Sequence, residues 1–167
     1  GQLHIFSVHQ SAHKIIEVPK SIVEVVGAID QEHLWVYEKN IAGSFVSILD
    51  IETKKLKQMF SSGESRHMTV NRKGEIIYID GSQLLRMQPS GDLTVLKDNM
   101  SSTHGLAAHE TGVYYVQEQQ LFNLEQNMKE TLVTELPEGI HQIETSSDDG
   151  KLVFFTNYPI YDFEILR

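Results

Sequence analysis

The stretch that decides the fold is residues 67–96, HMTVNRKGEIIYIDGSQLLRMQPSGDLTVL, because its pattern returns at residues 104–134. The second copy reads HGLAAHETGVYYVQEQQLFNLEQNMKETLVT, and 37 residues separate His67 from His104. Each copy holds four short runs of β-branched and other apolar residues between polar or Gly-bearing turns, which predicts four antiparallel strands. No segment keeps a helical apolar spacing over about ten residues. The chain therefore reads as all-β with an internal repeat.

Two weaker copies flank this pair. One begins at His141, again 37 residues further along, and ends before a fourth strand. The other covers residues 22–60, with a longer second turn around Asn40–Ser44. Ahead of it, the apolar runs Leu3–Val8 and Lys14–Pro19 resemble the third and fourth strands of one more repeat.

Repeats near 40 residues with four strands each predict a β-propeller, because one blade cannot bury both of its faces and must stack on neighbours. We expect about four blades of four-stranded antiparallel sheet, or a segment of a five- or six-bladed ring. A β-sandwich is the alternative, but it does not demand matched positions every 37 residues. The predicted organisation is a single domain over 1–167, with blades near 20–60, 61–98, 99–137 and 138–167 and closing strands from 1–19.

Composition excludes several classes of function. The formal net charge of −9 argues against binding to a phosphate backbone, so no nucleic-acid partner is expected. Apolar runs such as Val113–Val116 are far shorter than the roughly 20 residues of a membrane span. The chain has no cysteine, which excludes disulfides and thiolate chemistry and leaves both cytoplasmic and extracytoplasmic locations open.

The sequence of the repeats resembles that of NHL-like and gluconolactonase-type propellers, in THGLAA at 103–108 and SSDDGKLVFFTN at 146–157. That resemblance implies the fold, which scaffolds, sensors, lactonases and lyases share. In the gluconolactonase-type enzymes a Glu and Asn or Asp residues at the starts of inner strands hold a divalent metal. Here those starts read His67, His104 and His141. Histidines at these starts resemble two further groups. The peptidyl-hydroxyglycine amidating lyases place His side chains from several blades around one metal, and the streptogramin lyases have His at such blade starts.

The three matched histidines are the strongest chemical signal. In a propeller the first strand of each blade lies nearest the central channel, so equivalent starts converge on one channel mouth. Three neutral imidazoles there would suit one Zn²⁺ or a similar divalent metal, with a fourth position for water. Glu24, near the equivalent place in the first copy, would serve as a further ligand or a general base. The competing interpretation is that each imidazole bonds backbone groups of the next blade and binds no metal.

Other signals favour structural roles. His9 and His13 have the spacing of a helical metal pair but flank a turn between apparent strands, which favours solvated loop residues. Asp148-Asp149-Gly150-Lys151 is predicted to be a hairpin turn rather than a calcium loop. Aromatic residues recur on second strands and predict a core between blades: Trp35, Tyr37, Tyr78, Tyr115 and Phe154.

Three functions follow as hypotheses. The leading one is a propeller that binds or senses a small molecule or a protein at the channel mouth or on its loops. The alternative is a metal-dependent hydrolase or lyase, lactonase-like, with His67, His104 and His141 as ligands. A third is an assembly role, since open blade edges expose unpaired backbone groups that favour self-association.

Overall fold

The computed structural model describes residues 1–7, 12–62, 67–100, 102–109, 111–137, 140–145 and 152–156. The chain divides into two compact units, Gly1–Glu64 and Ser65–Arg167. All the described regular structure is antiparallel β-sheet, which confirms the all-β prediction. No helix in the described ranges has the length and apolar character needed to span a bilayer.

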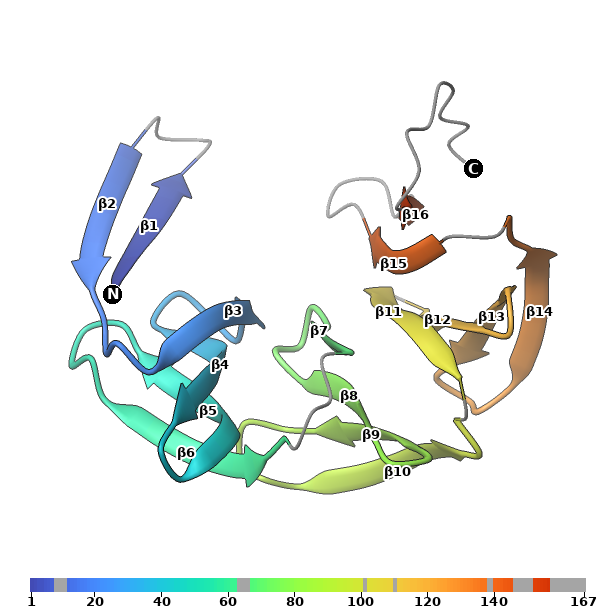
Figure 1. The fold of residues 1–167 in the computed structure, drawn as a ribbon, viewed down its shortest axis with the longest axis horizontal. Coiled ribbons are helices and arrows are strands. Elements are labelled where there is room, and N and C mark those ends of the chain that lie inside the picture. The colour runs from blue at the N-terminus through green and yellow to red at the C-terminus, as the bar shows by residue number, and fades with distance from the viewer. Residues whose placement is uncertain are drawn as a thin grey trace. The chain divides into compact units, whose positions relative to one another are not determined.

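The first unit contains a two-stranded sheet and a four-stranded sheet, each an up-and-down meander (Figure 1). The hairpin is formed by β1 (Gln2–Ser7) and β2 (Ala12–Glu17). The larger sheet, in the order β3-β4-β5-β6, contains β3 (Ile22–Ala28), β4 (His33–Asn40), β5 (Gly43–Asp50) and β6 (Leu56–Ser61).

The predicted long turn near Asn40–Ser44 is wrong. Residues 41 and 42 alone form the turn, and the two flanking strands, β4 and β5, run for 8 residues each. The side chain of Asn40 stabilises this tight turn, because its Oδ1 accepts a hydrogen bond from the Ala42 N–H at 2.8 Å. The extra residues of the first copy therefore lengthen the strands rather than the loop.

The second unit contains two complete four-stranded sheets and one hairpin. The first sheet is β7 (Met68–Val70), β8 (Ile76–Asp80), β9 (Gln83–Met87) and β10 (Leu93–Asp98). The second is β11 (Thr103–His109), β12 (Gly112–Gln117), β13 (Gln120–Glu125) and β14 (Glu130–Glu135). The hairpin is β15 (Ile140–Thr145) and β16 (Leu152–Thr156).

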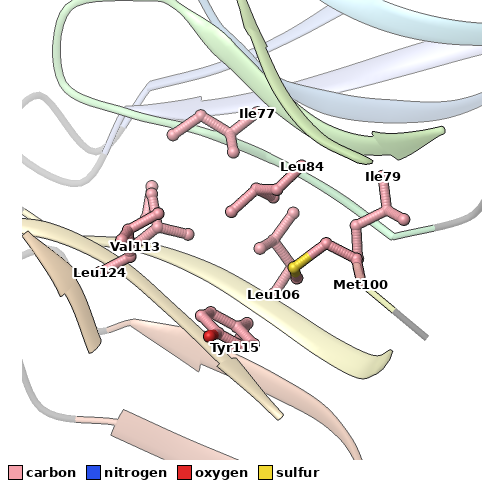
Figure 2. Packing of buried hydrophobic residues seen from close by; sticks show 9 residues of the cluster. Ile77, Ile79, Leu84, Met100, Leu106, Val113, Tyr115 and Leu124 are labelled. Carbon is pink, nitrogen blue, oxygen red and sulfur yellow. The ribbon is translucent and has the colours of Figure 1, made fainter. Parts of the chain in front are cut away.

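The sheets β7–β10 and β11–β14 pack face to face through one apolar cluster (Figure 2). Alternation along each strand explains this packing, because every second side chain points to the same face. Ile77 and Ile79 of the first sheet meet Leu106, Val113 and Tyr115 of the second. The burial of Trp35, Tyr78 and Tyr115, all at most 4% exposed, agrees with the predicted core role of these aromatic residues. Tyr37 is only half-buried, and the side chain of Phe154 lies outside the described residues.

The first strands of neighbouring sheets lie side by side in the second unit, with β11 between β7 and β15. The backbone N–H of Ala108 donates to the Thr69 hydroxyl at 3.2 Å, which links β11 to β7. On the other side, a Cβ on Gly105 would lie 3.0 Å from the side chain and 3.1 Å from the backbone nitrogen of Ile143. Glycine therefore allows the close approach of β11 to β15, because a larger residue here would push Ile143 away by a few tenths of an ångström.

These sheets are the blades of a β-propeller: four antiparallel strands in sequence order, stacked face to face, with the first strands adjacent. In the sheet β11–β14 the described residues of the first strand are mostly buried, whereas the last strand is mostly exposed. The predicted blade bounds, the single domain and the closing role of residues 1–19 stay predictions.

Candidate functional site

Two places in the second unit are candidate sites, and they lie at opposite ends of the same strands. The first is the row of first-strand starts that carries the matched histidines. His67 directly precedes β7, while His104 and His141 are each the second residue of β11 and β15. Because β11 is adjacent to both other strands, the fold places these three backbone positions on neighbouring strands.

Only part of the predicted metal site is described. The side chain of His67 is half-buried, whereas those of His104 and His141 lie outside the described residues. Among the described residues no group of three or more His, Cys, Asp or Glu gathers. The three-histidine metal site therefore stays a prediction. Glu24 is exposed on β3, in the other unit, opposite Tyr37 of β4.

Two other sequence signals have different outcomes. His13 does not lie in a loop as predicted, but within β2, where its Nε2 is 3.2 Å from Nδ1 of His4. It lies there because β2 begins at Ala12, two residues before the expected start at Lys14. His9 and the turn at 148–151 lie outside the described residues.

The second candidate site is a pocket of about 220 Å³ between the sheets β7–β10 and β11–β14. Its floor is apolar and comes from both sheets, with Ile77, Leu96, Val113 and Leu124 among the lining residues. Three of these side chains belong to the cluster drawn in Figure 2, so the pocket opens at the margin of the inter-blade core.

The rim of the pocket is polar and is built by tight turns. The turn after β7 is held by Asn71, whose Oδ1 accepts hydrogen bonds from the backbone N–H groups of Lys73 and Glu75, both at 3.0 Å. This turn carries Arg72 and Lys73 to the rim. The turn after β13 contributes further polar groups, including the Glu125 carboxylate.

A mostly buried carboxylate organises one wall. The Glu75 side chain is 11% exposed, and its Oε2 accepts a hydrogen bond from Asn71 Nδ2 at 2.8 Å. Nη1 of Arg86, on β9, lies 3.9 Å from the same oxygen. A buried carboxylate requires such partners. At this distance Arg86 and Glu75 form an ion pair without a direct hydrogen bond. The N–H groups of the Arg86 guanidinium can therefore also donate hydrogen bonds to a bound molecule.

His109 forms the opposite side of the rim at the last position of β11. Its Nδ1 is 3.0 Å from the Thr111 hydroxyl, and its ring meets the Tyr114 ring edge-on with centroids 5.5 Å apart. Both contacts orient the imidazole. At about 3.3 Å per strand residue, His104 and His109 are about 16 Å apart along β11. The pocket and the histidine row are thus separate sites.

Sequence reasoning missed the pocket because its residues come from turns of two repeats and are not matched between them. Asn71 and Glu75 flank a turn in one copy, whereas the equivalent turn of the next copy runs from Ala108 to Gly112. The spacing of Asn before a Gly-bearing turn was the one available local signal, and it predicts a turn rather than a binding site.

The sequence matches no protein-family model and no curated protein. Solved structures match at the level of the fold. A chain of the nidogen/laminin complex has a TM-score of 0.68 at 9% identity, covering 93% of this chain and 64% of that chain. Virginiamycin B lyase from Staphylococcus aureus has 0.59 at 16%, covering 93% and 56%. Regucalcin, a calcium-binding protein from Agrobacterium tumefaciens, has 0.58 at 13%, covering 92% and 59%.

These similarities confirm the β-propeller fold, and with it the predicted resemblance at the level of the fold alone. This chain spans less than two thirds of the length of each of the three proteins. The three include a member of a protein complex and a lyase, so propellers of this shape serve both binding and catalysis.

Proposed function

We propose that this propeller binds a small polar molecule in the pocket between the sheets β7–β10 and β11–β14. The observation that carries the proposal is the combination of an apolar floor with a few charged groups on ordered turns, which is typical of small-ligand sites. A volume of about 220 Å³ equals that of about seven water molecules at about 30 Å³ each, which suits a sugar or an amino acid.

The charges on the rim favour a carboxylate ligand. Three cationic side chains line the pocket, those of Arg72, Lys73 and Arg86, against the two carboxylates of Glu75 and Glu125. Glu75 accepts a hydrogen bond from Asn71, and Arg86 compensates its charge, which leaves Arg72 and Lys73 against Glu125. The planar fork of Arg86 matches a carboxylate with two parallel hydrogen bonds. A sugar acid or an amino acid would thus place its carboxylate on Arg86 and its apolar carbons on Ile77 and Val113.

Isothermal titration of the full chain with a panel of sugar acids and amino acids tests this proposal. We expect a member of the panel to bind, and the Arg86→Gln variant to bind it at least about tenfold more weakly because one charged hydrogen-bonding partner is lost. Lys57→Gln, on β6 and outside the pocket, is the control and should bind normally. Absence of binding throughout the panel, or equal binding by Arg86→Gln, would refute the proposal.

A second candidate function is that of a metal-dependent hydrolase or lyase centred on the histidine row. Two observations support it: the three histidine positions lie on adjacent strands, and Gly105 allows β11 and β15 to approach closely beside His104 and His141. With His67 completing three imidazole ligands, one Zn²⁺ or similar ion would activate a bound water as a base or nucleophile. Glu24 is proposed as a helper.

Elemental analysis of untagged protein, beside the variant in which all three histidines are alanine, tests the metal. We expect the untagged protein to hold one more equivalent of zinc, manganese or iron than the variant, and to act on lactone or lyase substrates. Protein that holds no metal after supplementation would exclude this function. The pocket titration is independent of that result, because the pocket lies at the other end of the strands.

A further inference from the structure

Outside both candidate sites, the N-terminal hairpin brings two histidines together on its exposed face. Nε2 of His13 lies 3.2 Å from Nδ1 of His4, and the ring centroids are 5.2 Å apart. The register explains the contact. His4 is paired with Ile15, so His13 is its diagonal neighbour on the adjacent strand, and both side chains point to the same face.

The hairpin presents this pair on an ordered backbone. Six consecutive residue pairs join β1 and β2 without a register shift, and a backbone hydrogen bond from Val18 to Gly1 at 3.0 Å extends the ladder. On the opposite face Ile16, which is paired with the half-buried Leu3, is only 6% exposed. A buried residue on one face favours a single register, and that register places both imidazoles on the other face, where they are exposed.

The spacing of the two nitrogens suits a shared metal ion. Zinc binds imidazole nitrogen at about 2.0–2.1 Å, so two ligands of a tetrahedral site lie about 3.3 Å apart. The observed 3.2 Å is close to that value. Only small ring rotations are therefore needed for both lone pairs to meet one ion.

We propose that His4 and His13 form a bidentate site for a divalent transition metal of the zinc and nickel class. Without metal, one ring donates its N–H to the other, as neutral imidazoles can. When the metal binds, it takes the place of this bridging hydrogen, which leaves to water. The former donor then takes a proton from water on its other ring nitrogen, so both rings stay neutral.

Two imidazoles supply only part of a metal ion's coordination sphere. In the described ranges no third His, Cys, Asp or Glu completes a group with the pair. Water, or a group from another molecule, would occupy the remaining positions, as in zinc sites that keep an exchangeable ligand. The site belongs to the first unit and does not depend on the proposed function.

Titration with zinc chloride and with nickel chloride tests the site. The background is the full chain with His67, His104 and His141 replaced by alanine, so that the other candidate metal site does not contribute. We expect one ion per chain, and binding at least about tenfold weaker in His4→Ala or His13→Ala, because each removes one of two ligands. His33→Ala is the matched control, since its ring is engaged with Asp30 at 3.0 Å, and it should bind as the background does.

Nitrogen-15 spectra of the unaltered chain provide a readout that needs no variant. Zinc should shift the imidazole signals of His4 and His13 together. Unchanged affinity in both single variants, no binding by the background protein, or a shift of only one of the two rings would overturn the proposal. Circular dichroism of each variant verifies that the fold is retained.

Discussion

Tyr115 is the residue whose replacement tests the packing of the blades most directly. It is fully buried on β12, and its ring belongs to the cluster that joins the sheets β7–β10 and β11–β14 (Figure 2). The ring also stacks on Phe122 with centroids 5.3 Å apart. Its hydroxyl donates to Oε2 of Glu130 at 2.6 Å, and Lys97 bonds the same oxygen. Tyr115 thus combines an apolar and a polar contribution.

The two contributions have different magnitudes. Replacing a buried aromatic residue by alanine costs about 3–5 kcal/mol, so Tyr115→Ala should lose about 4 kcal/mol. Tyr115→Phe keeps the ring and removes one hydrogen bond to a charged group, which is worth about 1.5–3 kcal/mol when buried. Because the Glu130 side chain is 35% exposed and keeps Lys97, we expect about 1–1.5 kcal/mol for Tyr115→Phe.

Urea unfolding followed by far-ultraviolet circular dichroism measures both values. With a slope of about 2 kcal/mol per molar urea, the midpoint should fall by about 2 M for Tyr115→Ala and about 0.6 M for Tyr115→Phe. Tyr114→Phe is the matched control, because its half-buried side chain points to the other face of β12. A double-mutant cycle with Glu130→Gln isolates the hydroxyl contribution. If Tyr115→Ala costs no more than Tyr115→Phe, the ring does not fill the inter-blade core and the packing argument fails.

Three further predictions concern the second unit. A Cβ on Gly112 would overlap the carbonyl oxygen of Leu124 and lie 2.8 Å from its carbonyl carbon. Gly112→Ala should therefore lower the urea midpoint far more than Gly81→Ala, where nothing lies within 4 Å of the Cβ and the cost is the left-handed φ of 57°. Burial raises the pKa of Glu130, but the hydrogen bonds from its two donors outweigh burial and hold the pKa below the ordinary 4.5. A lowered carboxyl pKa stabilises the fold above about pH 4.5, and this stability is lost as the pH falls through the folded-state pKa. The difference in the free energy of unfolding between the native chain and Glu130→Gln should therefore shrink as the pH falls from about 5 to about 3. A difference that stays constant over this range would contradict the lowered pKa of Glu130. Finally, His104→Ala should change the free energy of unfolding by less than about 0.5 kcal/mol if the residue serves a site, whereas a loss like that of Tyr115→Ala would make it structural.

Local chemistry was enough to predict the strands and the blades. The apolar runs beginning at Ile76 and Val113 and the turns that separate them are local signals, because strand alternation and turn preference act over a few residues. The period of 37 residues between His67 and His104 then implied stacked copies of one unit. The prediction of aromatic core positions was confirmed for Trp35, Tyr78 and Tyr115 but not for the half-buried Tyr37.

Tertiary structure decided what lies between the strands and between the sheets. The side-chain contact of His4 with His13 depends on the register of β1 with β2, which no local pattern reveals. The pocket depends on turns from two sheets that meet only after packing, so Arg86 and His109 carry no shared sequence signal. The sequence by itself thus determined the repeated blade and its matched histidines, because strand alternation and the repeat of 37 residues can both be read directly along the chain. Face-to-face packing of the sheets determined the pocket, and strand register determined the exposed histidine pair. Each brings together residues that are distant along the chain and meet only in the folded protein.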